Sequence, residues 1–517
     1  MTARRGEPLT WRHLAMWDEH GSMHLGATRA RLPCNDSDAG DAIMAERPGE
    51  LHYVPGDGTW YVWDGRCHRP DREDGAGKVV NEWARRQREM LRHARAMVAA
   101  RVQEELRDGG REPPEAALRA AFRRAWSGEG WEAAEKYAAG LMRSAGLSAL
   151  EKYLRTLCGT SGEVFEFSRA DGFLNCANGT VNLATGELRP HNPAQMITYC
   201  LETEYHPAKS GEALQFWGML CRVTADADSA GYLLRVLGYS LLGRNPEHLF
   251  PFLAGPAGSG KTKVLWMVAR VLGELAHSAG TDLIASVPHG RNARTENSIR
   301  GRRLVVISEM SSRIKMDEAQ VKRLTGEPEV AVNQHYAKTE IRTPVSWLLF
   351  GATNDLPSVS SFDGGLRRRI AVIPGGPGLE PWEVDTGKAE KVLAAESEAI
   401  LAMLVRACRQ YFREGLPRPL AVDLETARYV AEQDTIDAFT AECCDMKPDA
   451  AVGGPAMPWE VPASALWLAY REWARGLAYL GRNEFYAGLG KKGGVTYDRS
   501  RHRFLGIRLN AEWSMKA

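Results

Sequence analysis

The chain has 517 residues, 44% of them hydrophobic and 25% charged, which is typical of a globular protein of about two to four domains. Its 66 Lys and Arg residues balance 65 Asp and Glu residues, which excludes a strongly basic protein, so nucleic-acid binding would have to come from local patches. The nine cysteines show no zinc-ligand spacing and no run of 18 apolar residues occurs, so we expect a reduced, cytoplasmic protein without a membrane segment.

The N-terminal part of the chain changes from an irregular to a helical pattern. Residues 1–40 are polar and predict an irregular leader. The segment LHYVPGDGTWYVWDG (51–65) alternates apolar and polar residues around Gly-Asp-Gly, which predicts a hairpin. Residues 76–158 are rich in Ala, Arg, Glu and Leu and predict helices, interrupted at REPPE (111–115). Asn-Gly and Thr-Gly pairs within 171–193 then predict tight turns between short strands.

A phosphate loop follows the apolar strand expected from Leu249 to Ala254. The loop reads GPAGSGKT and consists of Gly255, Pro256, Ala257, Gly258, Ser259, Gly260, Lys261 and Thr262. Its glycines let the backbone curl so that N–H groups face phosphates, and the helix expected after it aims the positive end of its dipole at the same anion. In this pattern Lys261 reaches the β and γ phosphates and Thr262 holds Mg²⁺. The sequence therefore predicts binding of ATP with Mg²⁺.

The next buried strand ends in an acid. RRLVVISEM (302–310) is typical of an interior parallel strand, and Glu309 stands near its carboxyl end. A carboxylate there suits activation of water or binding of Mg²⁺ beside a phosphate loop. A charged residue that merely caps the strand is the alternative. Because Ser308 rather than an acid precedes it, either Glu309 serves as both base and metal ligand, or Thr262 and water hold most of the metal.

A third buried strand and an arginine cluster follow. VSWLLFGATNDLP (345–357) contains Asn354, which can orient the attacking water and sense the γ phosphate, or can simply form a turn before Asp-Leu-Pro. DGGLRRRIAVIP then places Arg367, Arg368 and Arg369 before a short strand. An arginine at such a point can reach the ATP of a neighbouring subunit as a finger.

The chain ends in helical sequence, a linker and a small basic module. Residues 381–448 predict helices, and DAAVGGPAMPWEVP (449–462) is a linker rich in Pro and Gly. The last segment, 463–517, carries basic side chains that could contact DNA phosphates. These are Lys491, Lys492, Arg499, Arg501 and Arg503. The alternative is an assembly or loader-binding domain with a solvated basic edge.

The order of these motifs resembles that of the superfamily III helicases, in the branch of phage and plasmid primase-helicases related to the poxvirus uncoating NTPase. The matching segments are GPAGSGKT, LVVISEM, VKRLTGEPEVAVNQHYAKTEIRTP, FGATNDLP and LRRRIAVIP. The resemblance implies an α/β fold with an AAA+-like superfamily III helicase core, a preceding helical domain and a C-terminal winged helix. The parts that it implies are an irregular leader (1–40), a mostly helical domain (41–240), the P-loop ATPase (241–380), a helical segment (381–448), a linker (449–462) and a winged-helix-like domain (463–517).

The resemblance also implies which residues meet DNA. In this family the tip of a hairpin between LTG and the third strand points into a central channel and grips single-stranded DNA. His335, Tyr336 and Lys338 are the candidates here, because lysine supplies charge for phosphates and tyrosine a stacking face. A plain surface hairpin is the alternative. In the C-terminal module the corresponding candidates are Lys491, Lys492 and Arg501.

An ATP site shared between subunits follows from the same resemblance. The assembly expected is a ring, a homo-hexamer, with ATP between neighbouring subunits. One subunit would supply Lys261, Thr262, Glu309 and Asn354. The next would supply Arg369 or Arg368, and Arg369 is preferred because it directly precedes the strand Ile370–Ile373.

The sequence thus predicts an ATP-dependent replicative DNA helicase of a phage or similar mobile element, acting on single-stranded or forked DNA in the host cytoplasm. Only about 40 residues precede the family's helical region, so we expect no primase in this chain and a separate primase or polymerase as partner. The alternatives are a replication initiator that melts an origin and a non-unwinding NTPase switch. A DNA-packaging motor is disfavoured, because no nuclease domain follows the ATPase.

Overall fold

The computed structural model of the chain describes residues 15–17, 23–25, 33–55, 58–107, 112, 114–127, 131–159, 172–286, 293–332, 341–359, 363–383, 385–433, 435–446, 459–474, 481–490 and 492–514. The chain divides into two compact units, residues 1–169 with 191–200 and residues 170–190 with 201–517. This division differs from the boundary expected at residue 240, because the segment 170–190 and the helices after residue 201 pack with the phosphate-loop sheet.

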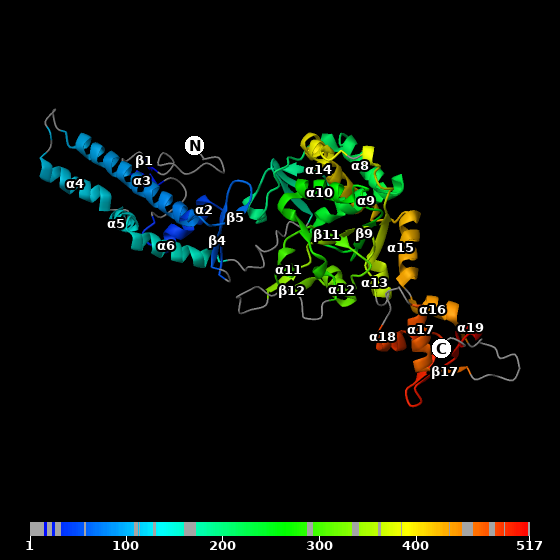
Figure 1. The fold of residues 1–517 in the computed structure, drawn as a ribbon. Coiled ribbons are helices and arrows are strands. Elements are labelled where there is room, and N and C mark those ends of the chain that lie inside the picture. Colours follow the sequence, from blue (N-terminus) through cyan, green and yellow to red (C-terminus); the bar gives the residue numbers. More distant parts are fainter. Residues whose placement is uncertain are drawn as a thin grey trace. The chain divides into compact units, whose positions relative to one another are not determined.

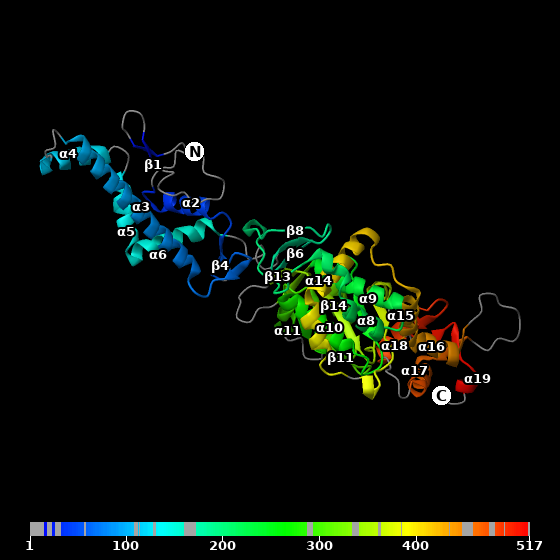
Figure 2. The same ribbon diagram turned by 90° about the horizontal axis from the view of Figure 1, so that it is seen from above.

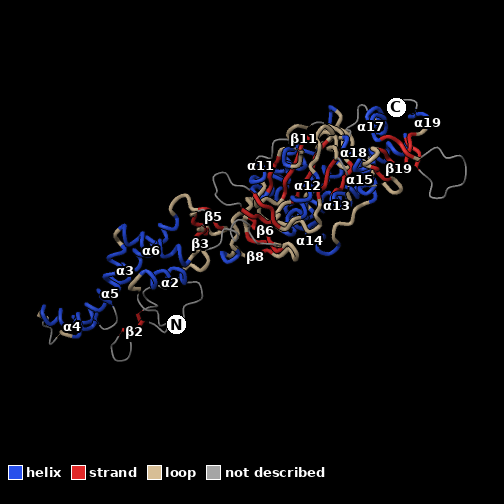
Figure 3. Tube along the Cα trace, turned by 90° about the horizontal axis from the view of Figure 1, so that it is seen from below, coloured by secondary structure: helices blue, strands red, loops and turns tan. Residues whose placement is uncertain are grey.

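The first unit combines two small antiparallel sheets, β1-β2 and β3-β4-β5, with a group of helices that make up most of its described residues (Figures 1 and 3). Its helices are α2 (Asp36–Glu46), α3 (Gly75–Glu105), α4 (Glu115–Ser127), α5 (Trp131–Leu141) and α6 (Ser144–Leu157), and its strands are β1 (Ala15–Trp17), β2 (Met23–Leu25), β3 (Leu51–Val54), β4 (Thr59–Trp63) and β5 (His68–Pro70). The hairpin predicted at 51–65 is confirmed, since β3 and β4 pair from Leu51 with Val62 to Val54 with Thr59.

The irregular leader expected over residues 1–40 does not extend that far. Helix α2 already begins at Asp36, because the Asn35 side chain accepts a hydrogen bond of 2.9 Å from the backbone N–H of Asp38 and so caps the first turn. The acids at the start of this helix also suit the positive end of its dipole. A segment interpreted as polar loop therefore contains the start of a helix.

The second unit contains a five-stranded parallel sheet in the order β10-β11-β14-β9-β15. Its strands are β9 (Phe250–Ala254), β10 (Ala276–Ala279), β11 (Leu304–Met310), β14 (Leu348–Thr353) and β15 (Ile370–Pro374). The alternation of strands and helices predicted for residues 249–374 is confirmed. Because all five strands run in one direction, their carboxyl ends meet at one edge of the sheet. The phosphate loop, Glu309 and Asn354 lie at that edge, whereas the arginine cluster precedes β15 and lies at the opposite edge.

Helices cover both faces of this sheet (Figure 1). One layer contains α8 (Leu214–Val223), α9 (Ala227–Tyr239), α10 (Lys261–Leu272) and α14 (Lys388–Glu414), and the other contains α11 (Ala293–Ser298), α12 (Glu318–Gly326) and α13 (Gly364–Arg369). Strand residues such as Phe252, Ile307 and Leu349 form one buried core with Val321 and Leu324 of α12. Helix α15 (Leu420–Gln433) packs along the edge strand β15.

Two smaller β elements accompany the five-stranded parallel sheet. The antiparallel sheet of β6 (Phe173–Cys176), β7 (Gly179–Asn182) and β8 (Leu188–Arg189) confirms the turns predicted within 171–193. It lies beside the end of α14 in Figure 2, where Arg409 packs against Gly186. The strands β12 (Glu329–Val332) and β13 (Ile341–Pro344) pair antiparallel and form the described base of a hairpin after α12.

The C-terminal module has its own core. Its elements are α16 (Thr435–Cys443), β16 (Cys444–Met446), β17 (Glu460–Pro462), α17 (Ala463–Trp473), α18 (Arg482–Leu489), β18 (Thr496–Asp498), β19 (Arg503–Leu505), β20 (Ile507–Leu509) and α19 (Ala511–Ser514). Strands β17, β19 and β18 form an antiparallel sheet with β19 in the middle. Phe439, Tyr470 and Phe485 are fully buried beneath it and join the three larger helices.

None of the helices that the structure describes combines the length and the apolar composition needed to cross a lipid bilayer.

Candidate nucleotide site

The phosphate loop joins β9 to α10 in the conformation that its glycines predict. Gly258 and Gly260 have φ angles of 75° and 93°, in the left-handed region that favours glycine. Helix α10 begins at Lys261, and no side chain caps its N-terminus. Its first backbone N–H groups therefore point toward the loop, where they can bind an anion.

The Lys261 side chain is held against the loop. Its ammonium donates hydrogen bonds of 2.8 Å to the carbonyl oxygens of Gly255 and Pro256 and of 3.1 Å to the hydroxyl oxygen of Ser259. Only 6% of the residue is exposed, and burial lowers the pKa of its ammonium. The sequence predicts that this lysine contacts phosphates, and the structure places it at the loop with its charge satisfied only by neutral oxygens.

Asn354 lies at the same place, one residue beyond β14. Its side-chain oxygen accepts a hydrogen bond of 3.2 Å from the Lys261 ammonium. The contact arises because β14 is the direct neighbour of β9, and the backbone N–H of Gly255 donates to the Thr353 carbonyl at 3.2 Å. The amide of Asn354 remains exposed to solvent beside the loop.

Glu309 is turned out of its strand by a bulge. The register of β11 with β14 shifts between Ser308 and Met310, and Glu309 has a φ angle of 61°. A non-glycine residue in that region costs about 1–3 kcal/mol, so its surroundings must hold it there. One such restraint is the hydroxyl of Thr353, which donates to the Met310 carbonyl at 2.9 Å. The carboxylate is exposed at the same edge of the sheet, one strand beyond Asn354.

The three arginines lie at the other end of β15, and the structure separates them. Arg367 and Arg368 are exposed, whereas Arg369 is 8% exposed. The Arg369 guanidinium donates to the Thr325 hydroxyl at 3.2 Å and to the Gly365 carbonyl at 2.7 Å. In this conformation Arg369 is enclosed by its own chain and is not presented to a neighbour, and its role as the finger stays a prediction. Arg368 and Arg367 are accessible.

The predicted DNA-contacting residues are only partly covered by the structure. His335, Tyr336, Lys338 and Lys491 lie outside the described residues. The hairpin base that carries the first three is described and ends with Val332 paired with Ile341. Arg501 is exposed in the turn between β18 and β19, and Lys492 is partly buried after α18.

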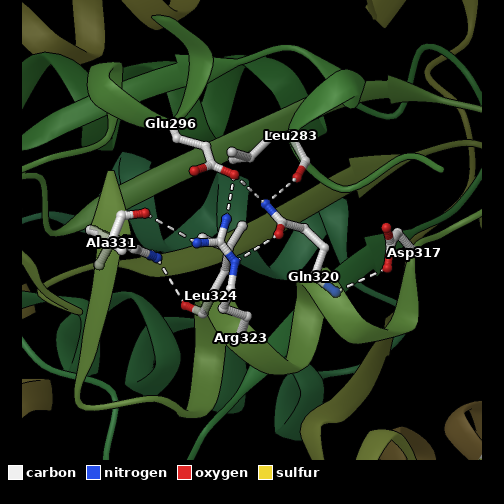
Figure 4. A network of polar contacts seen from close by, with 8 residues as sticks. Leu283, Glu296, Asp317, Gln320, Arg323, Leu324 and Ala331 are labelled. Atoms are coloured by element: carbon white, nitrogen blue, oxygen red, sulfur yellow. Dashed lines mark hydrogen bonds and ion pairs between the residues drawn. The ribbon is translucent and has the colours of Figure 1, made fainter. Parts of the chain in front are cut away.

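The base of that hairpin is tied to two helices by a polar network (Figure 4). Arg323 of α12 forms an ion pair with Glu296 of α11 and donates to the Ala331 carbonyl of β12 at 3.3 Å. Gln320 donates to Glu296 at 2.8 Å and accepts from Arg323 at 2.9 Å. Side chains of α11 and α12 thus hold the first strand of the hairpin base in place.

The sequence interpretation missed a segment that wraps the phosphate loop. After β15, the backbone N–H of Leu379 donates to the Gly258 carbonyl at 3.1 Å. Arg222 of α8 fixes this segment through the Pro377 carbonyl at 2.9 Å and the Glu383 carboxylate at 3.1 Å. Between these anchors Trp382 is 81% exposed. The Gly-Gly-Pro-Gly run after the strand was the available signal, since it allows close approach to another backbone.

Comparison with known protein families gives two matches. Residues 41–223 match the family described as D5 N terminal like, and residues 253–369 match a family of unknown function, DUF5906. The second match covers the phosphate loop, the acid strand, the Asn354 strand and the arginine cluster.

Individual relatives are more distant. A putative helicase, L207/L206 of Acanthamoeba polyphaga mimivirus, is 24% identical over 287 residues, which is 51% of this chain and 30% of that protein. The chain thus spans less than a third of that relative. Among solved structures, an apo form of the NrS-1 C-terminal region is 13% identical over 47% of this chain and 56% of that one, with a TM-score of 0.33. A second apo structure of that region is 12% identical over 60% of this chain and 77% of that one, also with a TM-score of 0.33.

Proposed function

This chain belongs to the phage-type primase-helicases, and from that premise we propose that it is an ATP-driven DNA helicase in the replication of a phage or related mobile element. The observation that carries the proposal is the meeting of Lys261 and Asn354 at the end of the phosphate-loop strand, with Glu309 one strand away. A binding pocket for phosphates, a polar amide and a carboxylate at one sheet edge are what hydrolysis of a phosphoanhydride requires.

The residues present fit ATP with Mg²⁺. Bound ATP would supply the phosphoanhydride bond whose hydrolysis drives the motor. Lys261 would exchange its loop carbonyls for phosphate oxygens and neutralise charge that develops on them. Thr262, exposed at the first turn of α10, would hold the metal. Glu309 would take the proton of the attacking water, and Asn354 would orient that water.

The position of the arginines supports a site shared between subunits. Strands β9 and β15 are parallel neighbours, and they pair from Phe250 with Ile370 to Ala254 with Pro374. The phosphate loop follows the carboxyl end of β9, whereas α13 comes before the amino end of β15. The two therefore lie at opposite edges of the sheet. Five residues of strand span roughly 16 Å at ~3.3 Å per residue. Arg368 therefore stands far from the phosphate loop of its own subunit and exposed to a neighbour. We place it in the ATP site of the next subunit in a ring, a homo-hexamer.

The remaining parts follow the same proposal. The core, with β14 inserted between β9 and β11, is an AAA+-like arrangement of the superfamily III helicases. The hairpin after α12 would carry His335, Tyr336 and Lys338 into the channel to hold single-stranded DNA. The module over 463–517 would be a winged helix, supported by the succession of β17, α17, α18 and the β18–β19 hairpin in one sheet-and-helix unit. Its basic residues Lys491, Lys492 and Arg501 would contact DNA.

The segment limits that we propose follow the motifs rather than the two compact units: the ATPase at 241–380, a mostly helical domain at 41–240 before it and a helical segment at 381–448 after it. The helicase would act on single-stranded or forked DNA in the host cytoplasm, beside a primase or polymerase. The test is ATP hydrolysis with and without single-stranded DNA, on wild type and on Glu309→Gln. Stimulation by DNA that the variant loses is expected. A wild-type protein that hydrolyses no ATP would contradict the proposal.

A further inference from the structure

The C-terminal module contains a cavity that the proposed ATP chemistry does not use. Its volume is about 890 Å³, and it lies between the start of α17, helix α18 and the β18–β19 hairpin. Small-molecule sites span roughly 300–1,000 Å³, so this cavity can hold a group the size of a nucleotide. The residues that line the cavity indicate which kind of ligand it can bind.

One wall is a single face of α18. The residues that line it recur at intervals of three and four, as neighbours on a helix surface do. They are Arg482, Asn483, Tyr486, Ala487 and Gly490. Because Ala487 and Gly490 are small, the helix leaves space beside the Tyr486 ring. Arg482 and Asn483 supply polar groups at the N-terminal end of the helix.

The opposite wall is the turn of the β18–β19 hairpin, which is held in one shape. The Asp498 carboxylate accepts a 2.9 Å hydrogen bond from the backbone N–H of Ser500. His502 has a left-handed φ angle of 51°, and its carbonyl accepts a 3.0 Å bond from the N–H of Ala463. Its ring nitrogen lies 3.3 Å from the Tyr497 hydroxyl. A restrained residue of this kind, lining a cavity, indicates a preorganised binding wall.

Two tyrosines offer stacking surfaces in the cavity. Tyr486 and Tyr497 face each other across 5.5 Å between ring centroids. The buried ring of Phe504 stacks on Tyr497 at 4.6 Å and supports it from behind. Both tyrosines are only partly buried, so part of each ring is available to a flat ligand.

The charge of the cavity is positive. Arg482 and Arg499 line it, and no carboxylate does so among the residues that the structure describes. Neither arginine has an ion-pair partner among the side chains described. By contrast, Arg503 of the same hairpin is neutralised by Glu460 at 2.6 Å and so cannot serve an incoming anion as readily.

We propose that this cavity binds one unpaired nucleotide of a DNA strand, with its base against Tyr486 and Tyr497 and its flanking phosphates at Arg482 and Arg499. Basic side chains combined with aromatic faces are how proteins hold single strands. An acidic peptide would use the arginines but leave both tyrosine rings without a partner. The inference rests on the proposed DNA-directed function and locates a second strand contact outside the hairpin after α12.

The experiment uses the full chain and a thymidine oligonucleotide that carries 4-thiothymidine for photo-cross-linking. Cross-linked peptides are mapped by mass spectrometry, and affinity is measured in parallel for an oligonucleotide of the same length without bases. We expect cross-links to peptides containing Tyr486 or Tyr497. Tyr497→Leu should weaken binding of the thymidine strand about tenfold and leave the abasic strand unaffected, because only stacking is lost. Tyr497→Phe should bind as wild type does.

Two further variants separate this cavity from the ATPase. Arg482→Ala combined with Arg499→Ala should weaken both strands, whereas Arg471→Ala, an exposed arginine of α17 that does not line the cavity, should change neither. Basal ATP hydrolysis should stay unchanged in all these variants. Loss of strand binding at this cavity can therefore be distinguished from loss of the proposed ATPase activity. Cross-links confined to other segments, or binding of an oligoglutamate peptide that the arginine variants abolish while DNA binding persists, would overturn the proposal.

Discussion

The ammonium of Lys261 lies 3.2 Å from the side-chain oxygen of Asn354, although 93 residues separate them in the sequence. The contact links the phosphate loop to the end of the neighbouring strand β14.

Lys261→Met should lower the turnover rate of ATP hydrolysis roughly 100-fold or more, because the charge that stabilises the transferring phosphate is removed. Lys263→Met is the matched control, since Lys263 is an exposed lysine of the same helix that pairs with Glu390 at 2.9 Å, away from the loop. Steady-state turnover with saturating ATP checks both. Equal losses in the two variants would mean that general damage to α10, rather than loss of a phosphate contact, explains the effect.

Glu309 offers a test in which activity and stability move independently. Glu309→Gly should remove turnover and yet leave the melting temperature unchanged or higher, because glycine relieves a strain of about 1–3 kcal/mol at its positive φ angle. Ser308→Gly, in the same strand with ordinary backbone angles, should lower the melting temperature. Thermal unfolding and ATPase assays measure the pair. Marked destabilisation by Glu309→Gly would show that the carboxylate is a structural group.

Substitution of Arg369 should impair the stability of the fold, whereas substitution of Arg368 should impair ATP hydrolysis. Arg369→Ala should destabilise the fold by about 1–3 kcal/mol, because Thr325 and Gly365 lose a buried donor. Arg368→Ala should fold normally, bind ATP and hardly hydrolyse it. Mixing it with Lys261→Ala under subunit exchange should recover part of the activity, because some interfaces regain both an intact loop and an intact arginine. No recovery after exchange is verified by mass spectrometry would count against an arginine acting between subunits.

Trp382 should contact the nucleotide base. Trp382→Ala should raise the KM for ATP about tenfold with little change in kcat, because a stacking surface contributes to binding rather than to the chemical step. Trp382→Phe should largely restore the KM. The KM is obtained from the rate of hydrolysis over a range of ATP concentrations. An unchanged KM in the alanine variant would show that the exposed Trp382 ring does not contact the nucleotide.

The sequence predicted the parts of the site that follow from a strand, a turn and a helix in succession. Lys261, Glu309 and Asn354 were found because each follows a buried apolar run, and parallel strands bring their carboxyl ends to one edge. The burial of Arg369 was not foreseen, because it depends on Thr325 of α12, which no local pattern reveals. The bulge at Glu309, the wrap around Gly258 and the cavity beside Tyr497 also depend on contacts between distant segments. Helix α2 was missed because the capping by Asn35 outweighs a polar composition.

Displacement of one strand from forked DNA by the purified chain is the decisive test of the proposed helicase activity. The substrate carries a fluorophore and a quencher on its two strands, and ATP starts the reaction. Wild type is expected to separate the strands only while it hydrolyses ATP, and Glu309→Gln is expected to bind the fork without opening it. A wild-type protein that hydrolyses ATP in the presence of the fork yet never separates the strands, or a Glu309→Gln variant that separates them at the wild-type rate, would contradict the account.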